Sequence, residues 1–234
     1  QGNVSIVRGP NGTGEGVGAG TVAGRPSGAR RGLLFRWGAA AESLAGLSGG
    51  DDTTVFGVND AGGFVGASNL GSAVRGFVGH RGGNVRELPP LPGDNASTAF
   101  ALNNSRQAVG FSSGARGETA VIWDAQSVPS ALPALEDARS SRAMAISSRG
   151  DVAGVVRLAH GALPVLWPSG QSARLLPVLA GHVSGEASSV NARGEVVGFS
   201  AQGSGKRRAT AWPASGEAID IGTLPGGDFS QALD

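Results

Sequence analysis

Apolar residues along this 234-residue chain come in short runs that turn-forming residues interrupt at regular intervals. Glu195 to Ser200 (EVVGFS), Ala209 to Trp212 (ATAW) and Ala218 to Leu224 (AIDIGTL) are three such runs. Short runs with β-branched and small apolar residues, bounded by Gly, Pro, Asn and Asp, are typical of β-strands. Because Gly, Ser, Asn or Pro interrupts nearly every stretch of ten residues, long helices are not expected. The pattern therefore predicts an all-β chain.

The strand pattern repeats with a period of about 44 residues. The last leucine of a Leu-x-x-Leu motif, which Ile221 opens in its final copy, recurs at Leu47, Leu91, Leu135, Leu179 and Leu224. A small or β-branched residue opens the following segment at Val55, Ala99, Ala143, Ala187 and Ala232. Each unit contains four short strand signals and no helix between them.

Four strands per unit match the content of a propeller blade, because a four-stranded sheet covers its two faces only by packing on neighbouring sheets. We therefore predict a β-propeller of five blades, each of four antiparallel strands. An open β-solenoid and a fragment of a larger propeller are the alternatives. The expected blades form a single repeat domain over residues 1–234, at about 10–54, 55–98, 99–142, 143–186 and 187–231.

Three further positions of the repeat carry turn and packing signals. A polar residue (Asn59, Asn103, Ser147 and Asn191) is followed three residues later by Gly62, Arg106, Gly150 and Gly194, which predicts tight hairpins, with Arg106 as the exception. A glycine within a strand, which indicates a bulge or a close backbone approach, recurs at Gly24, Gly66, Gly110, Gly154 and Gly198. Trp37, Trp123, Trp167 and Trp212 share one position, where Gly79 stands in the second unit, and we expect these tryptophans to pack in the core.

The first unit is irregular, because NGTGE (residues 11–15) stands where an inner strand is expected. Either residues 4–7 (VSIV) supply that strand, or the carboxyl-terminal residues 232–234 fold back beside the first blade.

Charge and composition exclude several partners. The formal net charge is +1, and the only tight basic cluster is GSGKRR at residues 203–208, so nucleic acid is not an expected partner. No apolar run approaches the length of a membrane-spanning helix, so membrane insertion is not expected. The absence of cysteine leaves the redox compartment open, and a start at Gln1 favours a processed, exported protein.

The fifth unit (VNARGEVVGFS, then ATAW and IGTLPGGDFSQA) and the second (VNDAGGFVGAS) resemble the extracellular HAF repeat of bacterial proteins. The resemblance covers nearly the whole chain after residue 16, and is weaker in the fourth unit, where Ser147 replaces Asn. It implies a bacterial protein located outside the cell, at the cell surface or in the periplasm. It implies no catalytic residues.

The loops between the outer strand of one unit and the inner strand of the next are the candidate ligand site. They are acidic or polar in every unit, and in a propeller they approach one mouth of the central channel. A ring of such side chains could bind calcium, the only cofactor that the sequence suggests, or accept hydrogen bonds from a sugar. Asp and Asn also stabilise turns by bonding backbone amides, and the uneven spacing of these residues favours that alternative. The candidate residues are Asp51, Asp52, Asp94, Asn95, Asp137, His182 and Asp228.

No catalytic residues are predicted. His80, His160 and His182 occupy non-equivalent positions in three units, and no nucleophile stands beside a base in any repeated position. The leading hypothesis is a secreted, non-catalytic module that binds a glycan, an envelope polymer or a protein. The alternatives are a hydrolase or lyase with its site at the channel mouth, and a structural protein that oligomerises through its terminal strand edges.

Overall fold

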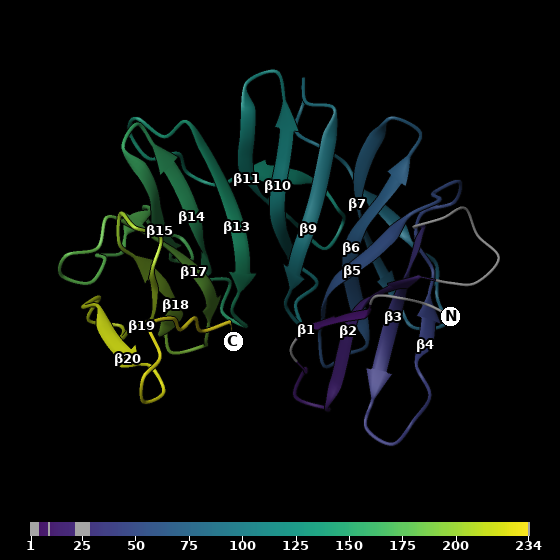
Figure 1. Cartoon of the computed structure of the whole chain (residues 1–234). Helices are drawn as coiled ribbons and strands as arrows, with labels where there is room; N and C mark the ends of the chain where they lie inside the picture. The colour runs from purple at the N-terminus through teal and green to yellow at the C-terminus, as the bar shows by residue number, and fades with distance from the viewer. Residues whose placement is uncertain (1–4, 9, 22–28, 234) are drawn as a thin grey trace. The chain divides into compact units, whose positions relative to one another are not determined.

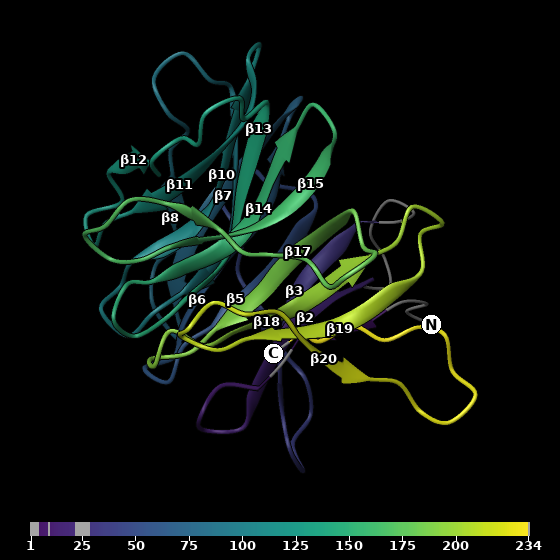
Figure 2. The same ribbon diagram turned by 90° about the vertical axis from the view of Figure 1, so that its left-hand side faces the viewer.

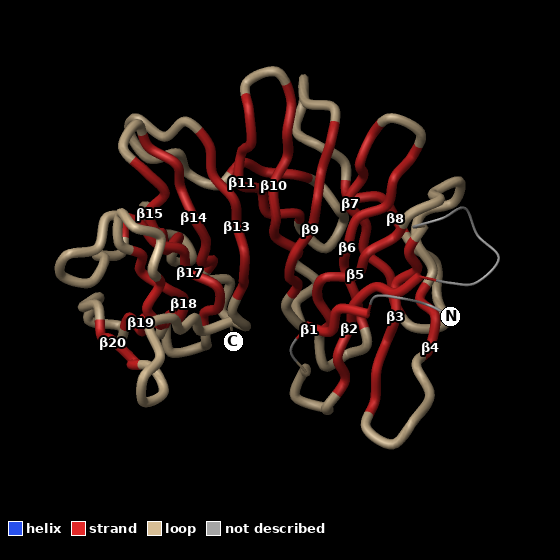
Figure 3. Tube along the Cα trace, viewed as in Figure 1, coloured by secondary structure: helices blue, strands red, loops and turns tan. Residues whose placement is uncertain are grey.

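The computed structural model describes residues 5–8, 10–21 and 29–233, and these residues form β-strands, turns and loops without a helix (Figures 1 and 3). Twenty strands form five four-stranded antiparallel sheets, and each sheet contains four consecutive strands of the chain. The expected all-β class and the five four-stranded sheets are confirmed. None of the described elements is a helix that could span a membrane.

The sheets are numbered here in chain order. The first contains β1 (Ser5–Arg8), β2 (Glu15–Thr21), β3 (Arg30–Arg36) and β4 (Glu42–Leu44). The second contains β5 (Thr53–Val58), β6 (Gly63–Leu70), β7 (Ala73–His80) and β8 (Arg86–Leu88). The third contains β9 (Ala96–Leu102), β10 (Ala108–Gly114), β11 (Gly117–Trp123) and β12 (Pro129–Ala131). The fourth contains β13 (Ser140–Ile146), β14 (Val152–Leu158), β15 (Gly161–Trp167) and β16 (Arg174–Leu175). The fifth contains β17 (Ser184–Val190), β18 (Val196–Ala201), β19 (Arg207–Trp212) and β20 (Ile219–Gly222), which lie side by side in Figure 2.

The chain divides into two compact units. Unit 1 comprises residues 1–116 and 122–130, and unit 2 comprises residues 117–121 and 131–234. In each unit the core lies between the faces of consecutive sheets. Val17, Leu34 and Leu44 of the first sheet pack with Val55, Phe64 and Phe77 of the second. Ala153, Leu166 and Leu176 of the fourth region pack with Ala187, Val190, Val196 and Trp212 of the fifth sheet. The sheets therefore bury their apolar faces against their neighbours.

The repeated glycines lie opposite β-bulges. Gly66, Gly110, Gly154 and Gly198 pair with Val55, Ala99, Ala143 and Ala187, next to a register shift in each sheet. A Cβ atom on Gly110 would lie 1.9 Å from the carbonyl oxygen of Thr98, so no side chain fits there. This confirms the predicted close backbone approach. Gly24 lies outside the described residues, and strand pairing places Gly18 opposite Val7 in the first sheet.

The inner strand of the first sheet is β1, which pairs with β2. Of the two alternatives for this strand, the one that uses residues 4–7 is therefore correct for residues 5–7. Val4 lies outside the described residues. β1 thus lies before residue 10, which is the expected start of the first blade. Asn11 has the turn role of Asn59, because its side-chain oxygen accepts the amide hydrogens of Thr13 and Glu15, and Gly14 adopts a φ of 80°.

Three of the four tryptophans join consecutive sheets. Nε1 of Trp123, Trp167 and Trp212 donates to the backbone carbonyl of Pro89, Pro133 and Pro177, at 2.7, 2.9 and 2.7 Å, within the Leu-x-x-Leu motif of the preceding sheet. Trp37 is fully exposed, so the expectation that it packs in the core is wrong. The strand register places Phe35 at the tryptophan position of the first sheet, because Phe35 pairs with Gly16 as Trp212 pairs with Val196, and Trp37 lies beyond the end of β3.

Candidate functional site

The hairpin turns between the first two strands of each sheet place a set of polar side chains at one end of the sheets. Asn59 accepts the Gly63 amide at 2.8 Å through its side-chain oxygen and donates through its side-chain nitrogen to the Asn103 carbonyl of the third sheet at 3.0 Å. Asn11 donates in the same way to the Asn59 carbonyl at 2.9 Å. In unit 1 this end of the first three sheets is thus held by a series of asparagine hydrogen bonds. We call it the turn face, defined by the turns at residues 11–14, 59–62 and 103–106.

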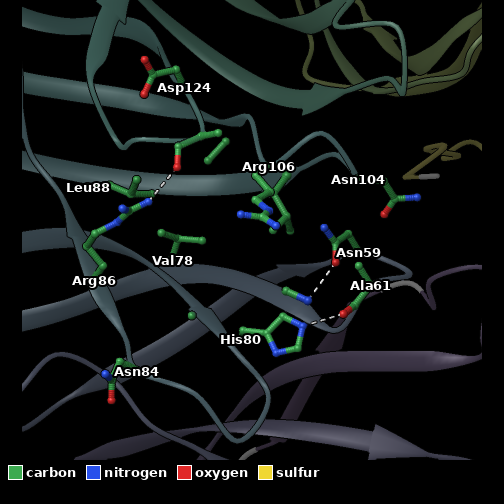
Figure 4. A pocket seen from close by; sticks show the side chains of 15 residues that line it. Asn59, Ala61, Val78, His80, Asn84, Arg86, Leu88, Asn104, Arg106 and Asp124 are labelled. Atoms are coloured by element: carbon green, nitrogen blue, oxygen red, sulfur yellow. Dashed lines mark hydrogen bonds between the residues drawn. The ribbon is translucent and has the colours of Figure 1, made fainter.

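A cavity of about 700 Å³ opens on the turn face between the second and third sheets (Figure 4). Its apolar wall consists of Val78 and Leu88 from the second sheet and Leu102 and Ala108 from the third. Charged and polar side chains surround this wall, and His80, Arg86, Arg106 and Asp124 are among them. The combination of an aliphatic wall with a few polar groups is typical of a ligand pocket.

Arg106 occupies this cavity from a strained turn position. Its backbone φ is 62°, in the left-handed region where the equivalent residues are Gly62, Gly150 and Gly194. The turn is otherwise unchanged, because the Arg106 amide donates to the Asn103 carbonyl at 3.1 Å as the Gly62 amide does to the Asn59 carbonyl. A side chain in this conformation costs about 1 to 2 kcal/mol relative to glycine. Strain of this kind is concentrated at functional positions.

Arg86 enters the cavity from β8 of the second sheet and bonds the third sheet. Its Nη2 donates to the Ala125 carbonyl at 2.9 Å, as Figure 4 shows. That carbonyl belongs to a turn that Asp124 stabilises, since Asp124 Oδ1 accepts the amides of Gln126 and Val128 at 2.9 and 2.8 Å. One oxygen of the carboxylate in the cavity is therefore occupied by its own turn.

His80 is fixed by two backbone carbonyls. Nε2 lies 2.8 Å from the Ala61 oxygen and Nδ1 lies 3.0 Å from the Arg81 oxygen. The ring is thereby engaged with the backbone of the second sheet.

A smaller hollow of about 410 Å³ lies between the first and second sheets of the same unit and shares Ala61 and His80 with the larger cavity. The buried Glu15 forms ion pairs there with Arg81 and, at 3.6 Å, with Arg36. Asp60 joins three turns, because its carboxylate accepts the Gly12 amide at 2.7 Å and the Asn104 side chain at 3.2 Å. These bonds join the turns of the first three sheets beside the two spaces.

The candidate residues taken from the sequence lie elsewhere. They occupy loops at the opposite end of the inner strands from the hairpin turns, and none of them lines either space. In the described part of the chain, no group of three or more His, Cys, Asp or Glu side chains could hold a metal ion.

Most of these candidates have local partners. Asp52 pairs with Arg30 at 2.9 Å, and hydrogen bonds from Arg30 lower the pKa of Asp52. The Asp94 carboxylate accepts a 2.6 Å bond from Ser112, and Asp137 takes a left-handed turn position with a φ of 60°, where Gly49, Gly93, Gly181 and Gly226 stand in the other loops. Asp228 pairs with Lys206 at 3.1 Å, and hydrogen bonding to Lys206 lowers the pKa of Asp228.

The other three candidates also lie in these loops. The Asn95 backbone bonds Ser113 and Arg75, and Asp51 is exposed. The His182 amide closes its turn on the Leu179 carbonyl at 2.9 Å, whereas its buried Nδ1 has no hydrogen-bond partner. These loops thus use acidic and polar residues mainly to build turns and ion pairs.

Comparison with known proteins shows the fold of the chain. No family model and no curated protein matches it. Solved structures with β-propellers do match. TolB from Acinetobacter baumannii is 12% identical with a TM-score of 0.64, and the match covers 92% of this chain and 53% of that one. A puromycin hydrolase S511A mutant complexed with PGG is 14% identical with a TM-score of 0.62, over 95% of this chain and 37% of the hydrolase. YCF48 bound to D1 peptide is 11% identical with a TM-score of 0.50, over 92% of this chain and 67% of that one.

The chain therefore has the β-propeller fold, and its four-stranded sheets are blades. It spans about half the length of the TolB chain and a smaller share of the hydrolase chain. At these identities the likeness concerns the fold alone, and propellers carry both binding and hydrolytic functions. Function has to be argued from the site.

Proposed function

We propose that this chain is a non-catalytic binding module of the propeller class and that the turn face of unit 1 is its ligand site. The observation that carries the proposal is the cavity of about 700 Å³ that Arg106 lines. A cavity of this size suits a small ligand or a segment of a larger one. The strained Arg106 turn supports a selected role for its side chain, because the repeat otherwise has glycine there.

The polar groups of the cavity support binding rather than catalysis. General acid–base or nucleophilic catalysis needs a base within hydrogen-bond reach of the group it activates. Both nitrogens of His80 face backbone carbonyls, and one oxygen of Asp124 is held by its turn. Among the described lining residues, no Ser, Thr or Lys side chain stands beside either group.

The resemblance to the extracellular HAF repeat supports the second part of the proposal, which is that the module works outside the cytoplasm of a bacterium. The partner is then a component of the cell envelope or of the surroundings of the cell, such as a protein, a glycan or an envelope polymer.

A blocking substitution tests the location of the site. Asn104→Trp places a large side chain at the rim of the cavity, whereas Ser148→Trp makes the same change at the equivalent turn of the next sheet, outside the cavity. Binding of glycan arrays, peptidoglycan fragments and peptide libraries to the parent and both variants should be measured. We expect a bound ligand to be lost with Asn104→Trp and kept with Ser148→Trp.

Equal binding by both variants would place the ligand elsewhere. An empty screen together with measurable hydrolysis of any substrate would replace the binding module by an enzyme.

A further inference from the structure

Arg86 and Arg106 carry the excess positive charge of the turn-face cavity. Neither forms an ion pair with a described residue, whereas Arg30, Arg75, Arg142 and Arg208 pair with Asp52, Glu87, Glu118 and Asp220. Asp124 is the one carboxylate among the described lining residues, and its Oδ1 already accepts two amides. The cavity therefore presents two guanidinium groups to one partly occupied carboxylate.

Guanidinium groups bind carboxylates with paired, charge-assisted hydrogen bonds, because their donors form a planar fork. Arg86 uses Nη2 for the Ala125 carbonyl, which leaves its other donors for a ligand. Arg106 has no hydrogen bond from its side chain to a described residue, and Figure 4 places this side chain inside the cavity from the third sheet, facing the second sheet. The two groups thus approach the space from two different sheets.

The remaining wall suits an aliphatic group. Leu88 and Ala108 are buried and Val78 and Leu102 are half-buried, and no Phe, Tyr or Trp side chain lines the cavity in the described chain. A sugar ring carries hydroxyl groups over most of its surface and needs several hydrogen-bond partners, which this wall does not offer. Aliphatic side chains, in contrast, are stabilised by contact with it.

We infer that the cavity takes a peptide segment in which an acidic side chain lies next to an aliphatic residue. The carboxylate bonds Arg106 and Arg86, and the aliphatic side chain packs on Leu88, Leu102 and Val78. This inference rests on the proposed function and specifies its ligand. It also explains why the turn contains Arg106 where the other copies contain glycine.

Two peptide pools test the ligand class. Both are N-acetylated, C-amidated hexapeptides randomised among Leu, Val and Ala, with Asp and Glu added in the first pool and Asn and Gln in the second. Native mass spectrometry of the parent chain with each pool identifies the bound peptides, and a titration of the best one gives its affinity. We expect peptides from the acidic pool to be retained and their amide counterparts to bind about 10- to 100-fold more weakly.

Arg106→Gly is the matched variant, because it restores the turn residue of the other copies. It should lower the affinity for the acidic peptide by about 10- to 100-fold, while the melting temperature stays equal to that of the parent or rises. Arg116→Gly removes the same charge from an exposed loop at the other end of the third sheet and should leave the affinity unchanged. A fall in affinity with no fall in stability distinguishes ligand binding from a structural role of Arg106.

The inference is overturned if the amide pool binds as well as the acidic pool, if Arg106→Gly binds like the parent, or if oligoglucuronate binds more tightly than any acidic peptide. In those three cases the ligand class is wrong, but loss of binding in Asn104→Trp would still show that the cavity is the ligand site. Loss of the proposed function would instead appear as equal binding by Asn104→Trp and Ser148→Trp.

Discussion

At the scale of single residues, the repeated positions act between sheets more than within them. Trp212 is 1% exposed and bonds Pro177 of the preceding motif, while Trp37 is fully exposed and lies two residues beyond Phe35, which the strand register places at the equivalent position of the first sheet. The second unit lacks this tryptophan, and Phe64 fills the space instead, since a Cβ on Gly79 would lie 2.4 Å from the Phe64 ring. The space at this position is thus filled by a tryptophan or, in the second sheet, by a phenylalanine from the neighbouring strand.

The same Trp→Phe substitution should therefore have a large effect on stability at Trp212 and a small one at Trp37. Trp212→Phe should lower the free energy of unfolding by about 1 to 3 kcal/mol, because a buried indole is replaced by a smaller ring and the Pro177 carbonyl loses its donor. Trp37→Phe should change it by less than about 0.5 kcal/mol, as is usual for exposed side chains. Urea unfolding followed by circular dichroism measures both. Equal effects would contradict the assignment of the tryptophan to the contact between sheets.

The acidic loop residues illustrate the limit of arguments from residue type. Asp52, Asp94 and Asp228 have the chemistry of ligand groups, and the structure pairs them with Arg30, Ser112 and Lys206. Asp137 likewise has a structural role, because aspartate tolerates the left-handed conformation that this turn requires. Whether a carboxylate binds a ligand or its own turn depends on neighbours that lie about 20 residues away in the chain.

At the scale of the element, a second repeated hydrogen bond joins the third strand of one sheet to the segment that follows that sheet in the chain. The amides of Gly76, Ala120 and Ala209 donate to the hydroxyls of Ser97, Ser141 and Ser230, each at 2.9 Å. The fourth copy has Pro164 and Gly185, so the donor and the acceptor are missing together. Ser230 therefore gives the carboxyl-terminal segment the same bond that β9 and β13 make. Its amide also donates to the Arg207 carbonyl at 3.0 Å.

If this bond fixes the carboxyl-terminal segment on the fifth sheet, Ser230→Ala should lower the free energy of unfolding by about 1 kcal/mol. The amide of Ala209 should then exchange faster, because it loses its acceptor. Hydrogen exchange followed by NMR reads that amide directly. Ser204→Ala, in an exposed loop, is the control and should leave the Ala209 amide unchanged. Unchanged exchange in Ser230→Ala would mean that the segment does not protect β19.

At the scale of the whole molecule, the sequence predicted the fold because its signals are local and repeated. The polar turn residues and the bulge glycines each lie within one hairpin and the leucine motif marks the end of each sheet, so a 44-residue period was enough to define the sheets. The first sheet departs from that period, because its inner strand β1 lies before residue 10. Its turn at Asn11 and its glycine at Gly18 therefore went unassigned.

The cavity could not be predicted in the same way. Its lining residues belong to two sheets and become neighbours only when the sheet faces pack, which no local pattern encodes. The one signal in the sequence was Arg106, an arginine at a position that otherwise contains glycine. A departure from the repeat was therefore more informative about function than the repeat itself.

The fold also determines how far a perturbation travels. Stability in a repeat array is approximately a sum of the stabilities of the units and of their contacts with immediate neighbours. Gly66 in unit 1 and Gly198 in unit 2 are equivalent, and a Cβ on either would lie about 2 Å from a carbonyl oxygen, that of Thr54 or of Glu186. Gly66→Ala should speed amide exchange in β5, β6 and the adjoining sheets and leave β17 to β19 unchanged, and Gly198→Ala should do the reverse. Hydrogen exchange followed by mass spectrometry measures both.

Each substitution should cost about 1 to 3 kcal/mol locally, whereas Gly203→Ala, with no heavy atom within 4 Å of its Cβ, should have no effect. Faster exchange along the whole chain in either variant would instead indicate that all five sheets unfold as one cooperative body.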